Sequence, residues 1–249
     1  LDEVTVALYL DEEYCYDRMA FPVRMGRIKS QEYQTAWFGL KKQLVMSQSF
    51  DDSSAEWGYW YVSGKKAAIA SKNMLDRFIA CGTTNFDFDE NGRKYIMAYD
   101  SENKLNQPLS GTMTVAFDDT VSIFYFGDWL KGYYFNEGKT ILDAIDDART
   151  NQDKVFAKCK SFDNKLKKAA KPYGEDNLLV LYAGLRQSVG AHKLVKDKQG
   201  NPLFLSKECH SNGCLCTVDV SYPSIPLYLL YNPVLVEGMM RPIYKFAKK

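Results

Sequence analysis

The sequence lacks a hydrophobic run long enough to cross a membrane, and it lacks net charge of either sign. No apolar stretch approaches the ~18 residues that a membrane-spanning helix requires. The 32 basic residues are nearly balanced by 31 acidic ones, which leaves a formal net charge of +1. Since no global field favours nucleic acid or an anionic membrane, we predict neither as a partner.

Cysteine is too sparse for a disulfide scaffold. Six cysteines are spread through 249 residues, and a chain of this length can bury a core without cross-links. The sequence also lacks an initiator methionine and a basic-then-apolar leader, because it opens at Leu1. We therefore expect a processed end from which a signal peptide was removed, and a secreted or periplasmic protein.

Composition is otherwise that of a globular protein, with 46% apolar and 25% charged residues. The first ~130 residues alternate short apolar runs, rich in aromatic and β-branched side chains, with turn residues, a pattern typical of an all-β region. One helix is predicted to interrupt it, at residues 72–81, with Gly82 as its C-terminal stop. The predicted strands cover residues 4–9, 35–40, 57–62, 95–99, 113–117 and 121–126.

The second half changes to a helical period. Apolar residues between Ile141 and Ala169 recur three, four or seven residues apart, which predicts one long helix or a broken pair. A further helix is predicted to carry His192 on its apolar face, and residues 197–201 form a turn. Two more helical segments are predicted to open at Pro223 and Pro233. We therefore predict a β-rich domain at 1–130 and a helical domain at 131–249.

Polar side chains concentrate in the segment between the last predicted helices. Five polar residues fall within 13 positions without helical periodicity, and such a compact polar loop is where function tends to reside. A well-hydrogen-bonded structural loop is the alternative. The five are Lys207, Glu208, His210, Asn212 and Asp219.

A series of motifs from Tyr182 to Pro242 resembles the glutaminase A family of extracellular glutaminases. Matching pieces run in order through both halves of the chain, and the sequence departs from the family pattern at Cys209-His210 and Cys216. The matching pieces are Trp57-Gly58-Tyr59, Asp118-Asp119-x-x-Ser122-Ile123-x-Tyr125-Phe126-Gly127, Leu185-Arg186-Gln187, Ala191-His192-Lys193, Phe204-x-Ser206-Lys207-Glu208, Ser211-Asn212-Gly213, Thr217-Val218-Asp219-Val220, Tyr222-Pro223-Ser224-x-Pro226-x-x-Leu229-x-Tyr231-Asn232-Pro233 and Gly238-Met239-x-x-Pro242-Ile243.

The resemblance implies an α+β multi-domain protein. A β-sandwich-like N-terminal half would precede the start of a six-hairpin α/α barrel. It also implies hydrolysis of the side-chain amide of glutamine to glutamate and ammonia. We expect this chain to carry only the first hairpins of the barrel, and the isolated piece to be inactive.

Amide hydrolysis needs an acid, a base and donors for the oxyanion. Glu208 and Asp219 are the acidic pair of the cluster, and we predict that they are the catalytic residues. Asn212 and Lys207 can donate to the oxyanion. We assign both of them to substrate binding, together with Tyr222, Arg186 and His192.

Structural alternatives exist for most of these residues. Asp219 can cap the following helix, Glu208 can pair with Lys207, Arg186 or Lys193, and His192 can be a core histidine. On a six-hairpin scaffold, paired carboxylates also suit a glycan-active enzyme. A non-catalytic module, in which the aromatic β-region holds a ligand, is the third possibility.

Metal and cofactor motifs are weak. The spacing Cys209-His210-x-x-x-Cys214-x-Cys216 fits no standard zinc site. Residues 87–92 copy the start of a calcium loop, but a hairpin with an Asn-Gly turn explains them better. We predict no metal, no cofactor and a small-molecule substrate, and the sequence does not indicate an oligomeric state.

Overall fold

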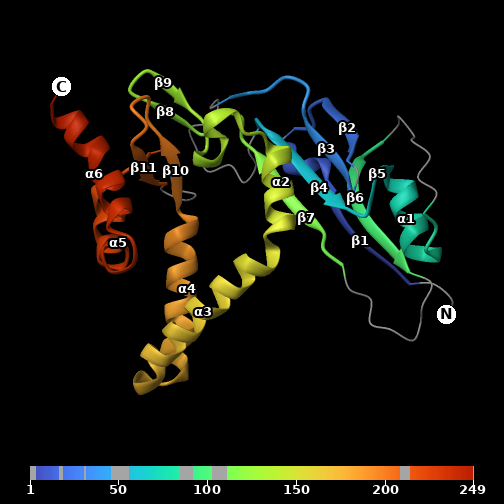
Figure 1. Ribbon diagram of the computed structural model, residues 1–249. Coiled ribbons are helices and arrows are strands. Elements are labelled where there is room, and N and C mark those ends of the chain that lie inside the picture. Colours follow the sequence, from blue (N-terminus) through green and yellow to red (C-terminus); the bar gives the residue numbers. More distant parts are fainter. Residues whose placement is uncertain are drawn as a thin grey trace. The chain divides into compact units, whose positions relative to one another are not determined.

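The computed structural model describes residues 4–16, 19–30, 32–45, 56–84, 92–102, 111–207 and 214–248. The chain divides into two compact units (Figure 1). The first comprises Leu1–Ser47 and Asp52–Thr120, and the second comprises Gln48–Asp51 and Val121–Lys249. The predicted domain boundary at residue 130 stays a prediction.

The first unit is built from two antiparallel sheets. One sheet has the strand order β1-β6-β5, and the other has the order β2-β3-β4-β7. Each of the predicted strands in this unit coincides with one of these strands, and β2 and β5 are additional. The strands are β1 (Val4–Asp11), β2 (Val23–Lys29), β3 (Gln34–Leu40), β4 (Tyr59–Gly64), β5 (Lys66–Ser71), β6 (Lys94–Glu102) and β7 (Thr114–Asp118).

The two sheets share one core, as in a sandwich. Leu10 and Ile96 from the first sheet pack with Phe38 and Val62 from the second, and all are at most 9% exposed. The short helix η1 (Glu12–Cys15) adds the buried Cys15 to this core. The β-sandwich-like character predicted for the N-terminal half is confirmed.

Helix α1 (Lys72–Cys81) covers the other face of the β1-β6-β5 sheet. Met74 and Leu75 pack against Tyr95 and Met97 of β6. The helix ends where predicted, because Gly82 adopts a left-handed φ of 67° and donates its N–H to the carbonyl oxygen of Phe78.

The second unit begins with a tight hairpin. Strands β8 (Ile123–Tyr125) and β9 (Asp128–Leu130) are joined by Phe126 and Gly127, whose φ angles are 48° and 97°. Two positive φ values in a two-residue loop match the twist of a hairpin. A short helix, η2 (Tyr133–Gly138), leads from this hairpin to the helices.

The predicted long apolar stripe is a broken pair of helices. Helix α2 (Ile141–Thr150) begins with a capping box formed by Thr140 and Asp143, and Asn151 separates it from α3 (Gln152–Ala170). Helix α3 then turns through η3 (Lys171–Tyr173) into the antiparallel α4 (Glu175–Gly190), at the bottom of Figure 1.

A second hairpin interrupts the helical half, and here the prediction is wrong. Residues 192–196 and 202–206 form the antiparallel strands β10 (His192–Lys196) and β11 (Pro202–Ser206). The predicted turn at 197–201 exists, but it joins strands. His192 therefore starts a strand, two residues beyond the end of α4 at Gly190. The pairing of this strand with β11 is a contact that a helical period does not reveal.

Helices α5 (Val218–Tyr231) and α6 (Pro233–Ala247) complete the unit. Helix α6 opens at Pro233 as predicted. Helix α5 does not open at Pro223, because its N-cap is Thr217, and Pro223 lies inside the helix with Pro226. No helix of the described residues has the length and apolar character required to span a bilayer.

The β10–β11 hairpin forms the middle layer of this part of the unit. Leu203 and Leu205 pack on Ile123 and Leu130 of the β8–β9 hairpin. Phe204, between them in sequence, points the other way and packs on Tyr228 of α5 and Met239 of α6. Because side chains alternate between the two faces of β11, one face packs in the core with β8 and β9 and the other packs in the core with α5 and α6. In its content of antiparallel sheets followed by helices, the predicted α+β class is confirmed.

Candidate active site

Four elements meet at the open end of the β10–β11 hairpin. Helix α4 ends at Gly190, β10 starts at His192 opposite Ser206, and the N–H of Lys207 donates to the carbonyl oxygen of Ala191 at 2.7 Å. The chain returns to this junction before it enters α5. The predicted site residues in β10, directly after β11 and in α5 therefore come from one place in the fold.

The two ends of the predicted catalytic loop are held together. Lys207 pairs with Leu215, and the N–H of Cys216 donates to the carbonyl oxygen of Ser206 at 2.9 Å. Cys216 adopts a left-handed φ of 59°, which is strained for a residue with a side chain. Glu208 and Asn212 lie outside the described residues, so their predicted roles stay predictions.

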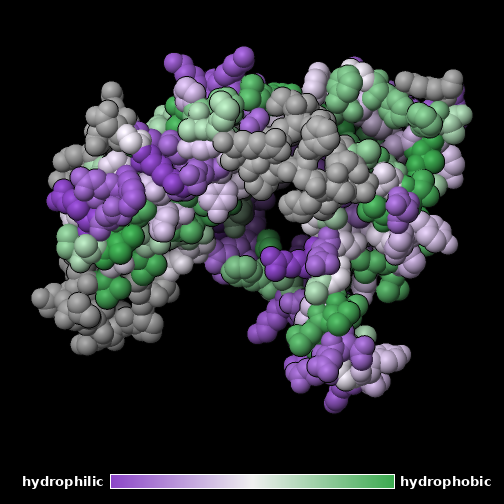
Figure 2. All heavy atoms as spheres, turned by 180° about the vertical axis from the view of Figure 1, so that it is seen from behind, coloured by the Kyte–Doolittle hydropathy of each residue, from purple (hydrophilic) through white to green (hydrophobic). Residues whose placement is uncertain are grey.

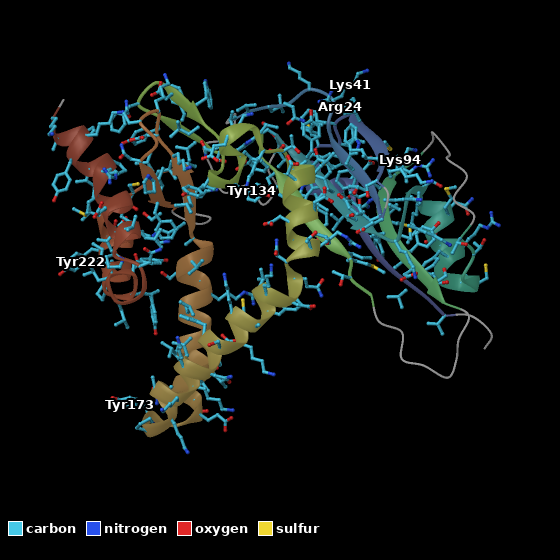
Figure 3. All side chains as sticks on the ribbon, in the orientation of Figure 1. Arg24, Lys41, Lys94, Tyr134, Tyr173 and Tyr222 are labelled. Carbon is cyan, nitrogen blue, oxygen red and sulfur yellow. The ribbon has the colours of Figure 1, made fainter. Side chains whose placement is uncertain are left out.

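Helix α5 presents Asp219 and Tyr222 to solvent. Asp219 lies in the first turn, and Thr217 rather than Asp219 is the N-cap residue. Asp219 is exposed, and Tyr222 is 73% exposed and points away from the helix (Figure 3). The cap role considered for Asp219 is therefore wrong.

A buried pair of hydroxyls fixes α5 to β11. Ser206 Oγ lies 2.7 Å from Ser221 Oγ, and the two residues are 1% and 4% exposed. One hydroxyl donates to the other, so neither is without a partner in a setting where an unpaired hydroxyl would be costly. This pair sets the position of the first turn of α5, and hence of Asp219, relative to the start of the catalytic loop.

His192 is packed among aromatic rings. Its imidazole stacks on Phe204 with ring centroids 4.4 Å apart and meets Tyr228 edge-on at 5.3 Å. Nδ1 donates to the carbonyl oxygen of Ser188 at 2.6 Å, and Ser188 Oγ lies 3.0 Å from Tyr228 Oη. The structure therefore supports the alternative of a core histidine more than direct substrate contact.

Burial also disfavours the charged form of His192. Desolvation lowers the pKa of His192, and the hydrogen bond to Ser188 only partly opposes it. Because Nδ1 donates to a carbonyl, the neutral ring carries its proton there. Nε2 is then a buried acceptor that has no hydrogen-bond partner among the described residues. A proton on Nε2 would likewise find no acceptor there.

Arg186 lies elsewhere, on the face of α4 that looks toward α3. With Asp163, Tyr182 and Leu185 it lines a shallow hollow of about 610 Å³, in which Tyr182 Oη donates to the carbonyl oxygen of Asp163 at 3.3 Å. In the described part of the chain, Arg186 has no hydrogen bond or ion pair, and no described contact links it to Asp219. The structure does not bring Arg186 together with the α5 residues.

Among the described residues there is no group of three or more histidine, cysteine or acidic side chains placed to hold a metal ion. Of the zinc-like motif, Cys214 and Cys216 are described, whereas Cys209 and His210 lie outside the described residues. Most of the calcium-like motif at 87–92 also lies outside them. The prediction of no metal therefore stays a prediction.

Four polar residues of this junction were missed as participants: Ser188, Ser206, Ser221 and Tyr228. Ser206 stands in the motif that carries the family resemblance, and Tyr228 lies on α5 seven residues after Ser221. Their partners are 15 to 40 residues away in sequence. No local pattern indicates such pairings.

Comparisons with known proteins place the chain in a family. Residues 2–169 match a family model described as "Domain of unknown function (DUF5127)", and residues 174–249 match "Glutaminase A six helical-hairpin domain". Glutaminase A of Aspergillus oryzae is 33% identical over 229 residues, which cover 83% of this chain and 32% of that protein. A "Probable glutaminase" of Arthroderma benhamiae is 34% identical over 111 residues, covering 44% of this chain and 12% of that protein.

No solved structure matches the chain. The chain spans about a third of the length of the Aspergillus relative. The family model at 174–249 begins at the residue before α4 and covers the candidate junction, β10–β11 and α5–α6. The resemblance drawn from the motifs is therefore confirmed, and this chain belongs to the glutaminase A family.

Proposed function

We propose that the protein hydrolyses the side-chain amide of L-glutamine, and that this chain contributes one wall of the active site. Support comes from its family, whose relatives carry the name glutaminase. The observation that carries the proposal is the junction at β10–β11. It gathers the ends of the polar loop and the exposed first turn of α5 inside the region that matches the hairpin domain.

The reaction adds water to the amide carbonyl and releases ammonia. One carboxylate of the pair Glu208 and Asp219 takes a proton from the attacking water. The other carboxyl group, as an acid, gives a proton to the departing nitrogen, so that glutamate and ammonia form. Donors at Lys207 and Asn212 stabilise the negative oxygen of the tetrahedral intermediate.

The position of Asp219 suits the role of base. It is solvent-exposed, so water can reach it, and it lies in the first turn of α5. Tyr222, three residues later, lies on the same face of the helix and can line the substrate site next to it. Of these two, Asp219 supplies the chemistry and Tyr222 the contact surface.

His192 acts through position. Its ring is held by Phe204, Tyr228 and Ser188, so it braces β10 against α5 next to the Ser206–Ser221 pair.

Arg186 remains a proposed substrate ligand. Its guanidinium is free among the described residues and can pair with the α-carboxylate of an amino acid in a site completed by the rest of the protein.

The test is ammonia release from L-glutamine by the complete natural protein and by its Asp219→Asn and Glu208→Gln variants. A general acid or base contributes about 10²–10⁴-fold, so each variant should lose at least about 100-fold in turnover with an unchanged melting temperature. Asp176→Asn is the matched control. Asp176 is also an exposed aspartate in the first turn of a helix, α4, and its loss should leave turnover within about twofold.

Two results would overturn the assignment. One is near-wild-type turnover in both carboxylate variants. The other is a lower melting temperature with turnover per folded molecule intact, which would make the carboxylates structural. Absence of ammonia release from glutamine by the wild-type complete protein would show that glutamine is not the substrate.

A further inference from the structure

A second cavity of the second unit lies on the other side of the β10–β11 hairpin from His192. Its volume is about 430 Å³, within the ~300–1,000 Å³ typical of small-molecule sites. Four pieces of chain enclose it: β8 with its turn, β11, the segment between β11 and α5, and α6. The lining includes Ile123, Tyr125, Leu205, Val218, Ile243 and Phe246.

The lining is apolar, and part of it is open to solvent. Ile123 and Leu205 form the floor and are 2% and 1% exposed. Phe246 and Val218 are 73% and 62% exposed, so large apolar side chains border the opening. Figure 2 shows apolar side chains reaching the surface over α5 and α6, on its right-hand side. Exposed apolar surface beside a hollow marks a binding site more often than an isolated exposed residue does.

The titratable groups in the wall are neutral at pH 7. Burial raises the pKa of Tyr125, and burial raises the pKa of the Cys216 thiol to about 11. Asp197 also faces Tyr125, but its carboxylate is occupied by the N–H groups of Gln199 and Asn201. The described part of the wall therefore presents no free anion.

A cation stands over the wall. Lys245 of α6 holds its Nζ 4.3 Å from the centroid of the Tyr125 ring and 4.9 Å from that of Phe126. In the described ranges Lys245 has no carboxylate partner, whereas Arg241, one turn earlier, is paired with Glu237 at 3.1 Å. Lys245 and Lys248 also outweigh the partial negative charge of the α6 C-terminus.

We infer that this cavity binds an apolar carboxylate, with the hydrocarbon body between β8 and α6 and the carboxylate on Lys245. The shape and lining select the apolar body, and charge complementarity selects the anionic end. A neutral hydrocarbon of the same length cannot make the charge contact with Lys245. This site is independent of the proposed hydrolysis of glutamine, which is a fully polar substrate.

The experiment titrates the chain with octanoate and, separately, with 1-octanol, followed by the methyl signals of Ile123, Leu205, Val218 and Ile243 in NMR. Octanoate should shift these signals and bind more tightly than octanol. Lys245→Met keeps the apolar stem but removes the charge. It should weaken octanoate about fivefold, as for a partly exposed ion pair, and leave octanol unchanged.

Two further variants separate the cavity from general charge. Lys248→Met removes a neighbouring charge from the same helix and should change octanoate affinity less than about twofold. Ile243→Trp fills the cavity and should abolish binding of both probes. The inference is overturned if octanoate leaves the lining methyls unshifted, or if Lys245→Met and Lys248→Met weaken it equally. It is also overturned if the same methyls shift with protein concentration alone, which would make this surface a contact between copies.

Discussion

At the scale of single residues, the folded environment of His192 disfavours the charged form of its imidazole. Burial lowers the pKa of His192, so the folded state binds its proton less readily than the unfolded chain. Stability from this group is then fully present above the unfolded pKa of about 6.5. It is lost as pH falls through that value toward the lower folded pKa.

We therefore predict that the melting temperature of the chain falls between pH 7.5 and pH 5 in a way that depends on His192. His192→Phe keeps a ring on Phe204 but removes the titration, so its melting temperature should vary less over that range, although it is lower at pH 7.5 because the bond to Ser188 is lost. His210→Asn, which changes the other histidine, is the control and should keep the wild-type slope. An unchanged slope in His192→Phe would contradict the prediction.

The Ser206–Ser221 hydroxyl pair makes a second prediction at this scale. Ser221→Ala leaves the Ser206 hydroxyl buried without a partner, which should lower the free energy of unfolding by about 1–3 kcal/mol in urea denaturation. Replacing both serines by alanine should cost less than the sum of the single changes, since no orphan remains. Ser224→Ala, on the same helix, removes only a local bond to the Ser221 carbonyl and should cost less than either. Strict additivity in the double variant would show that the hydroxyls do not act as a pair.

At the scale of elements, the contact between α6 and β11 depends on one glycine. A Cβ at Gly238 would lie 3.0 Å from the N atom of Phe204 and 3.1 Å from the carbonyl oxygen of Pro202. Both are backbone atoms of a paired strand, which cannot rotate away as a side chain can. The glycine therefore allows the helix to approach the hairpin closely enough to bury Met239.

Gly238→Ala should accordingly destabilise the chain by about 1 kcal/mol or more in urea denaturation, despite the better helix propensity of alanine. Gly184→Ala is the matched control. Gly184 lies within α4, and among the described residues nothing stands within 4 Å of the position that its Cβ would take, so alanine should raise the free energy of unfolding by about 0.5–1 kcal/mol. Stabilisation by both substitutions would mean that α6 does not need the close approach.

The extent to which the sequence predicts the fold also differs from element to element. Strands β1 and β6 alternate aromatic or β-branched residues and were predictable. Strand β2 was missed because Gly26 and three charges mask its alternation. The glycine stands there because the Trp37 indole lies over it, and a Cβ would come within 2.7 Å of Trp37 Nε1. That reason is tertiary and has no local signal.

The candidate site could likewise be predicted from the sequence only in part. The polar loop and Asp219 could be singled out from composition and resemblance. The placement of His192 could not, because it depends on the pairing of His192 with Ser206, fourteen residues along the chain. Helical spacing in the preceding segment continued smoothly into β10, so the period alone gave no boundary between them.

At the scale of the whole molecule, helix α5 carries apolar surface that the described residues of this chain leave uncovered. It has apolar side chains on every side. Tyr228 is buried, whereas Leu229, Leu230 and Tyr231 are 54%, 74% and 47% exposed. A helix that is apolar all round is typical of a buried position. The matched family model describes a domain of six helical hairpins, and the relative from Aspergillus is about three times as long as the matched region.

We predict that the 249-residue chain alone releases no measurable ammonia from glutamine, whereas the complete natural protein does. Amide hydrolysis requires a site that orients substrate and excludes bulk water. Three of the described site residues are open to solvent: Asp219 and Arg186 are exposed, and Tyr222 points outward. The measurement is ammonia release at equal concentrations of folded protein, with circular dichroism to show that the short chain is folded. Activity of the short chain near that of the complete protein would show that the hydrophobic surface of α5 does not mark a missing wall of the site.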